Sequence, residues 1–223
     1  MTDTRILKRL HAAATQLRKA ARWKGSSIGV DATTDSYVFE LLCFFDVALA
    51  SGGLTPTIVA RTDRRKGRQP IAKWPKSPAE MSNYSYLLLT DKTTGDLVYR
   101  LCPGIKIEDT DGKKRAPDVN LLVAGTSEKP VHTDLVLSWD AKFVTDPAGA
   151  MSDVGVADFI YTLNHCLQPS GSRVRWLAET TEKRYRASGL VTNGDMSSER
   201  DAALKRAGIF ETARFPLNPS TRP

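Results

Sequence analysis

Two apolar segments of the chain carry chargeable side chains where buried strands would be expected to be apolar. Asp118 stands at the start of the first segment, and Asp140, Ala141 and Lys142 follow one another at the end of the second. A charged group inside a buried strand is costly unless another group pairs with it. Residues two apart on a strand share a face, so Asp140 and Lys142 are expected to project together.

If the two segments form neighbouring strands, Asp118, Asp140 and Lys142 meet in one patch, with the carbonyl group of Ala141 near the same edge. Two carboxylates a few ångströms apart repel each other unless a cation lies between them. A hard divalent cation with oxygen ligands resolves this conflict, Mg²⁺ above all, with Mn²⁺ as its substitute. The alternative is a structural salt bridge between Asp118 and Lys142, which would leave Asp140 unexplained.

These residues also form a known pattern. "PD" stands at 117–118 and "DAK" at 140–142, and 22 positions (140 − 118) separate the two acids. Upstream, Glu40 lies within the apolar run "YVFELLCFF". Over residues 35 to 195 the chain resembles the PD-(D/E)xK nucleases, the restriction-endonuclease-like superfamily. It departs from them in using "DAK" for the more common "ExK" and in lacking a Gln-x-x-x-Tyr signature on the helix that follows.

The resemblance implies a role for each matching residue. Asp118, Asp140 and the carbonyl group of Ala141 resemble the Mg²⁺ ligands, and Lys142 resembles the residue that orients the attacking water. Glu40 resembles the outer carboxylate, which holds water at the metal or a second ion. The alternative for Glu40 is a position on the thin solvent-facing side of its helix.

The surplus of positive charge points to a polyanionic partner. Thirty-two lysine and arginine residues against 25 acidic residues give a formal charge of +7, and the basic residues cluster at 61–68, 113–115 and 183–186. Nucleic acid is the favoured partner. Trp74, within a basic loop, would either stack on a base or anchor the loop to the protein body. The predicted contacts are Arg61, Arg64, Arg65, Lys66, Arg68, Lys73, Trp74, Lys113, Lys114 and Arg115.

Other functional classes receive little support from the composition. The three cysteines are far apart and form no CxxC motif, and only three histidines are present, so a zinc site is not expected. This cysteine usage is typical of the reducing cytoplasm. No apolar run approaches the roughly 20 residues that cross a bilayer, and no glycine-rich phosphate loop is found.

The pattern of apolar residues predicts an α/β fold: a restriction-endonuclease-like mixed β-sheet flanked by helices. Residues 1–30 are expected to form a basic amphipathic helix and a linker, and residues 31–223 the nuclease-like domain. Further helices are predicted within 37–53, 151–168 and 196–208. Strands are predicted at 55–61, 84–91, 96–102, 116–124, 134–144, 173–180 and 188–193.

Together these features predict a Mg²⁺-dependent endonuclease that cuts DNA in preference to RNA. By analogy it would serve as the nuclease subunit of a prokaryotic defence or mobile-element system. With no separate target-recognition domain expected, target choice would come from a homodimer, from the basic loops or from a partner protein. The alternatives are an inactive nucleic-acid-binding or scaffold protein on the same fold and an RNA-processing nuclease.

Overall fold

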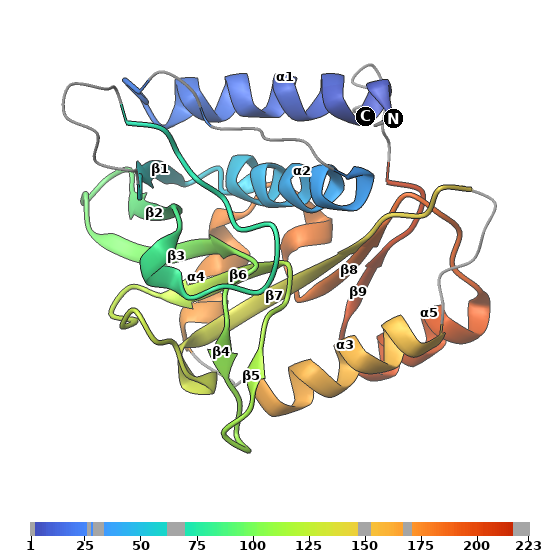
Figure 1. Cartoon of the computed structure of the whole chain (residues 1–223). Helices are drawn as coiled ribbons and strands as arrows, with labels where there is room; N and C mark the ends of the chain where they lie inside the picture. The colour runs from blue at the N-terminus through green and yellow to red at the C-terminus, as the bar shows by residue number, and fades with distance from the viewer. Residues whose placement is uncertain are drawn as a thin grey trace.

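A computed structural model describes residues 3–25, 28, 34–61, 70–146, 153–166 and 171–215. Its centre is a seven-stranded mixed sheet in the order β1-β2-β3-β6-β7-β8-β9 (Figure 1). These strands are β1 (Leu54–Val59), β2 (Tyr86–Asp91), β3 (Leu97–Pro103), β6 (Val119–Val123), β7 (Leu135–Lys142), β8 (Gly189–Thr192) and β9 (Phe210–Thr212). A separate two-stranded sheet pairs β4 (Ile107–Glu108) with β5 (Lys114–Arg115).

The sheet changes from antiparallel to parallel pairing at β7. Strands β1, β2, β3, β6 and β7 pair antiparallel, whereas β7 with β8 and β8 with β9 pair parallel. A parallel pair needs a long crossover connection. Two helices, α3 (Asp153–Cys166) and α4 (Gly171–Glu179), lie between β7 and β8, and α5 (Ser198–Arg206) lies between β8 and β9.

Helices cover both faces of the sheet (Figure 1). On one face, α1 (Thr4–Ala20) and α2 (Asp35–Ala50) pack in the main core with strand residues such as Leu121 and Trp139. On the other face, Phe159 of α3 and Leu204 of α5 pack against Leu190 of β8. The sheet therefore lies between helices on both of its faces, which agrees with the predicted mixed α/β class.

Helix α2 forms where the sequence predicts it. Its N-cap is Thr34, whose hydroxyl group accepts a hydrogen bond from the backbone N–H of Tyr37. Nearly all of its side chains are buried, because α1 lies on one side of it and the sheet on the other. Glu40 is one of the few residues of α2 that remain partly exposed.

The N-terminal amphipathic helix is confirmed as α1, which packs along α2 (Figure 1). Ile6, Leu10 and Leu17 are fully buried, and they belong to the same core cluster as α2 and the sheet. Among the described residues, no helix is long and apolar enough to span a membrane.

One predicted strand is wrong. Residues 173–180 were expected to be extended, but most of them form helix α4. Trp176 is fully buried, its indole N–H donates to the carbonyl oxygen of Tyr185 at 2.7 Å, and its ring packs against Tyr99 and Trp139. In so short a segment, alternation of polar and apolar residues does not exclude a helix held by a single buried anchor.

Candidate active site

The register of the sheet brings Asp118 and Asp140 together. Val119 of β6 pairs with Trp139 of β7 in an antiparallel ladder, so the next position along this ladder sets Asp118 opposite Asp140. Directly opposite residues of an antiparallel pair project on the same face. Asp118 Oδ2 also accepts a hydrogen bond from the backbone N–H of Ala141 at 2.7 Å, which holds the carboxyl group against the end of β7.

Lys142 lies in the same patch and pairs with the acid on its own strand. Its Nζ atom is 2.7 Å from Asp140 Oδ2, and the two side chains are 38% and 12% exposed. The ion pair therefore differs from the structural alternative considered for the sequence, in which Lys142 would pair with Asp118. Asp118 instead accepts a hydrogen bond from the N–H of Ala141 and shares a hydrogen bond with the side chain of Asp140.

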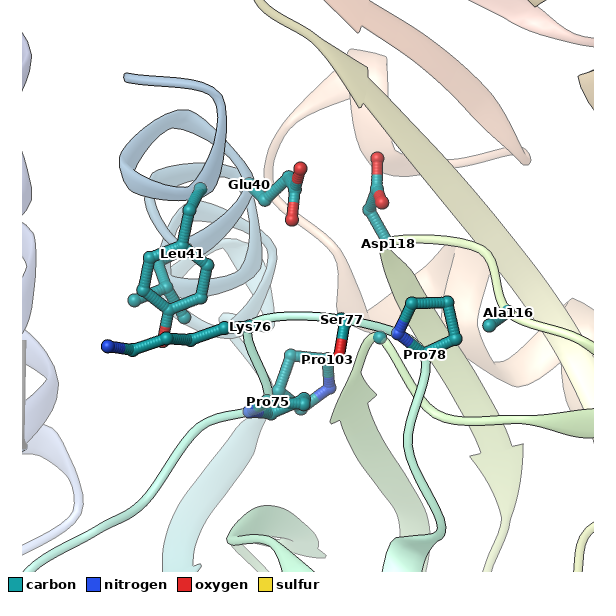
Figure 2. Close-up of a pocket in the computed structure, with 11 residues that line it drawn as sticks. Glu40, Leu41, Pro75, Lys76, Ser77, Pro78, Pro103, Ala116 and Asp118 are labelled. Carbon is teal, nitrogen blue, oxygen red and sulfur yellow. The ribbon is translucent and has the colours of Figure 1, made fainter. Parts of the chain in front are cut away.

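Glu40 approaches this patch from helix α2. The pKa of Glu40 is raised to about 7. Burial is the main cause; the charge of Asp140 also raises the pKa, and the charge of Lys142 lowers it. Figure 2 shows the carboxyl groups of Glu40 and Asp118 on the same side of a pocket. The side chain therefore faces the predicted site, and the solvent-facing alternative for Glu40 does not describe its surroundings.

The acids of this patch influence one another's ionisation. Burial raises the pKa of Asp118 well above its ordinary value, and the nearby Asp140 raises it further, while Lys142 lowers it. Desolvation lowers the pKa of Lys142, but the charges of Asp140 and Asp118 outweigh it, so the net shift is upward. Lys142 is therefore held as a cation among carboxyl groups.

The chemistry of the donor atoms suits a hard cation. Within the described part of the chain, no group of three or more His, Cys, Asp or Glu side chains is arranged to hold a metal ion. The resemblance implies Asp118, Asp140 and the carbonyl oxygen of Ala141 as ligands, with Glu40 as the outer carboxylate, and these three acids do not form such a group. Carboxylate and carbonyl oxygens are the ligands that Mg²⁺ prefers.

A polar pair that the sequence did not single out supports the two acids. Asn120 and Ser138 are fully buried and lie opposite each other in the ladder. Their side chains are 3.1 Å apart, and Asn120 Nδ2 donates to the carbonyl oxygen of Pro117 at 2.9 Å. This bond fixes the backbone just before Asp118. The spacing in the sequence could have revealed this pair, because Asn120 and Ser138 each lie two positions from an acid and therefore on the same face of the strand.

The residues predicted to contact nucleic acid fall into three groups. Arg64, Arg65, Lys66 and Arg68 lie outside the described residues. Arg61 pairs with Glu128, and the Nζ atom of Lys73 lies 5.1 Å from the centre of the Tyr84 ring. Lys113 and Lys114 are exposed on the β4–β5 hairpin, which also carries Arg115. Among the residues that the structure describes, no ion pair or hydrogen bond joins this basic group to the candidate active site.

The prediction that Trp74 contacts nucleic acid is corrected by its burial. The side chain is only 3% exposed, and its ring packs edge-on against Phe44 and Phe45 of α2. Its indole N–H donates to the carbonyl oxygen of Ile28 at 2.7 Å. No ring face is left for a base, so Trp74 anchors its loop to the protein body, the alternative considered for the sequence.

We expect Trp74→Phe to affect stability and not binding. The substitution keeps most of the buried ring but leaves the carbonyl group of Ile28 without its donor, so the free energy of unfolding should fall by about 1–3 kcal/mol. Urea denaturation would measure this loss, and fluorescence anisotropy with a labelled oligonucleotide would measure affinity. A large loss of affinity with unchanged stability would show that the ring reaches the ligand.

Asp109 organises the β4–β5 hairpin and sets the position of Arg115. Its carboxyl group accepts hydrogen bonds from Arg115 Nε and from the backbone N–H groups of Asp111 and Lys113. Desolvation acts to raise the pKa of Asp109, but these hydrogen bonds outweigh it and lower the pKa to about 2. The carboxylate that Arg115 contacts is therefore ionised at neutral pH. Its negative charge offsets the positive charge with which Arg115 would attract a phosphate group.

This shift predicts a pH dependence of stability. A pKa that is lower in the folded state stabilises the protein above the unfolded-state pKa, near 4 for an aspartate, and the contribution is lost as the pH falls toward about 2. Asp109→Asn should therefore be less stable than the wild type at pH 7, with the difference shrinking below about pH 4. Denaturation of both proteins across this range would test it; a difference that does not change with pH would contradict it.

No protein-family model, no curated protein and no solved structure matches the chain.

Proposed function

We propose that this protein is a metal-dependent endonuclease that hydrolyses phosphodiester bonds, in DNA more readily than in RNA. The observation that carries the proposal is the meeting of Asp118, Asp140 and Lys142 at one end of the β6–β7 ladder, with Glu40 facing them from α2. Acids grouped in this way contribute little to stability by themselves. They serve a reaction that needs clustered negative charge beside a cation.

The order of elements supports a restriction-endonuclease-like core. A helix that bears Glu40 precedes the strand that follows Pro117-Asp118, and the strand that ends in Asp140-Ala141-Lys142 comes next. A helix and a parallel strand, α3 and β8, then follow. This order agrees with the one that the PD-(D/E)xK resemblance implies, and the agreement supports the proposal.

Mg²⁺ fits the oxygen donors of Asp118, Asp140 and the carbonyl group of Ala141. When bound, such an ion lowers the pKa of water to make a nucleophile and offsets charge on the phosphate. The hydrogen bond from the N–H of Ala141 orients Asp118 for this task, and the buried Asn120 supports the preceding peptide.

Lys142 and Glu40 would act on the substrate and on water. The Lys142 ammonium, held by Asp140, can donate a hydrogen bond to the attacking water and can offset negative charge on the phosphate as the new bond forms. Glu40, whose carboxyl group lies on the same side of the pocket as that of Asp118, can accept a hydrogen bond from water there. The basic hairpin residues Lys113 and Lys114 would contact the nucleic-acid backbone, which sets affinity and not sequence preference.

Cleavage assays test the proposal directly. Purified protein is incubated with supercoiled plasmid and with structured RNA in Mg²⁺ or Mn²⁺, with EDTA as the control. We expect nicking or linearisation of the plasmid that EDTA abolishes. Preferential cleavage of the RNA would show that the protein is an RNA-processing nuclease that uses the same site. Salt-dependent binding of nucleic acid with no cleavage in any metal would overturn the proposal and favour the inactive binding protein.

A further inference from the structure

A small pocket opens directly beside the candidate active site (Figure 2). Its volume is about 230 Å³. It lies between helix α2, the segment 75–78 and the segments that flank β6 and β3. It is lined by Tyr37, Glu40, Leu41, Pro75, Lys76, Ser77, Pro78, Pro103, Gly104, Ala116 and Asp118.

The two sides of the pocket differ in chemistry. Figure 2 shows the carboxyl groups of Glu40 and Asp118 on one side and three proline rings on the other. Those rings belong to Pro75, Pro78 and Pro103. Proline side chains are apolar and conformationally restricted, so packing a bound group against them costs little side-chain entropy. The exposed Lys76 adds a positive charge at the rim.

The size of the pocket restricts what can enter. Pockets for drug-sized ligands hold roughly 300–1,000 Å³, and about 230 Å³ is smaller than that range. One nucleobase fits such a space, whereas a base pair does not. A backbone that places its phosphate against Asp118 would therefore reach this pocket with a single, unpaired base.

We propose that the pocket binds one unpaired base of the substrate strand next to the phosphate that is cut. The inference rests on the proposed function and deepens it: the substrate is single-stranded or frayed at the cleavage point. The base lies against the proline rings, and its exocyclic amino groups can donate hydrogen bonds to the carboxyl group of Glu40.

Pocket-filling variants test this inference by binding. Ser77→Trp and Ala116→Phe add a ring to the pocket from different segments, while Thr57→Trp, on the exposed side of edge strand β1, serves as the control. Affinity for a labelled single-stranded oligonucleotide and for a blunt duplex is measured by fluorescence anisotropy in EDTA. We expect each filled variant to bind the single strand about tenfold more weakly, with no change for Thr57→Trp and little for the duplex.

A second measurement uses the wild-type protein alone and does not depend on how the variants fold. One nucleotide at a time in the single-stranded oligonucleotide is replaced by an abasic site. We expect one position to weaken binding about tenfold and the others to have little effect. Equal effects at all positions, or unchanged affinity in folded Ser77→Trp and Ala116→Phe, would overturn the inference.

The cleavage reaction separates this inference from the proposed function. In Mn²⁺ the wild type should cut single strands or frayed ends faster than blunt duplex, and the filled variants should lose that preference. Equal cleavage rates for single-stranded and duplex substrates, unchanged in the pocket-filling variants, would overturn the pocket inference. The proposed function would remain. Position-specific binding without cleavage in any metal would support the base pocket and overturn the nuclease.

Discussion

Asp140→Ala should reduce cleavage of plasmid DNA by at least about 100-fold, a loss typical of removing one group that stabilises charge in a transition state. Asp140 is the acid that both faces Asp118 across the ladder and holds Lys142 at 2.7 Å. Its removal takes away one of the proposed oxygen ligands and also frees the Lys142 ammonium to change position. Initial rates in Mg²⁺ and Mn²⁺, compared with the wild type, measure the loss.

The same variant should retain its affinity for DNA. Backbone contacts supply most of the salt-dependent affinity of such proteins, and Asp140 contributes negative charge, so binding should be unchanged or slightly tighter. Asp96→Ala is a suitable control, because it removes an exposed acid in the turn between β2 and β3, far along the sheet from β7. Cleavage by Asp140→Ala at the wild-type rate would show that the catalytic site lies elsewhere.

The sequence was most informative where side-chain periodicity and charge coincide. Asp118 and Asp140 could be expected to meet because consecutive strands are usually neighbours in a sheet, and the antiparallel register of β6 and β7 then places the two acids opposite each other. The hairpin of β2 and β3 and the long apolar helix α2 are confirmed for a similar reason. Local pattern and short connections left few alternative arrangements for these elements.

Other features depend on contacts between distant residues, which a single sequence does not reveal. Trp74 stands among basic residues, yet three partners from other parts of the chain, Ile28, Phe44 and Phe45, enclose it. Lys142 pairs with Asp140 of its own strand, whereas Asp118 accepts a hydrogen bond from the N–H of Ala141. Which partner a side chain contacts depends on the three-dimensional arrangement, which residue types alone do not reveal.

Breaking the buried ion pair between α1 and α2 should cost the protein about 3–5 kcal/mol of unfolding free energy. Arg9 and Asp46 are joined at 2.9 Å, and their side chains are only 7% and 3% exposed. The Arg9 guanidinium also lies 4.4 Å from the centre of the Phe215 ring. Asp46→Leu leaves a buried guanidinium without its carboxylate, and Arg9→Met leaves a buried carboxylate without its guanidinium. Urea denaturation of each variant measures the loss.

The double variant Arg9→Met/Asp46→Leu distinguishes a lost charge pair from lost packing. Removing both charges avoids the desolvation of an unpaired ion, so the double variant should be more stable than either single variant. Lys205→Met breaks an exposed i,i+4 pair with Asp201 and should cost less than about 0.5 kcal/mol. If the single variants at Arg9 and Asp46 lose no more than this control, α1 does not dock on α2 as described. If the double variant loses the sum of both, packing and not charge holds α1 in place.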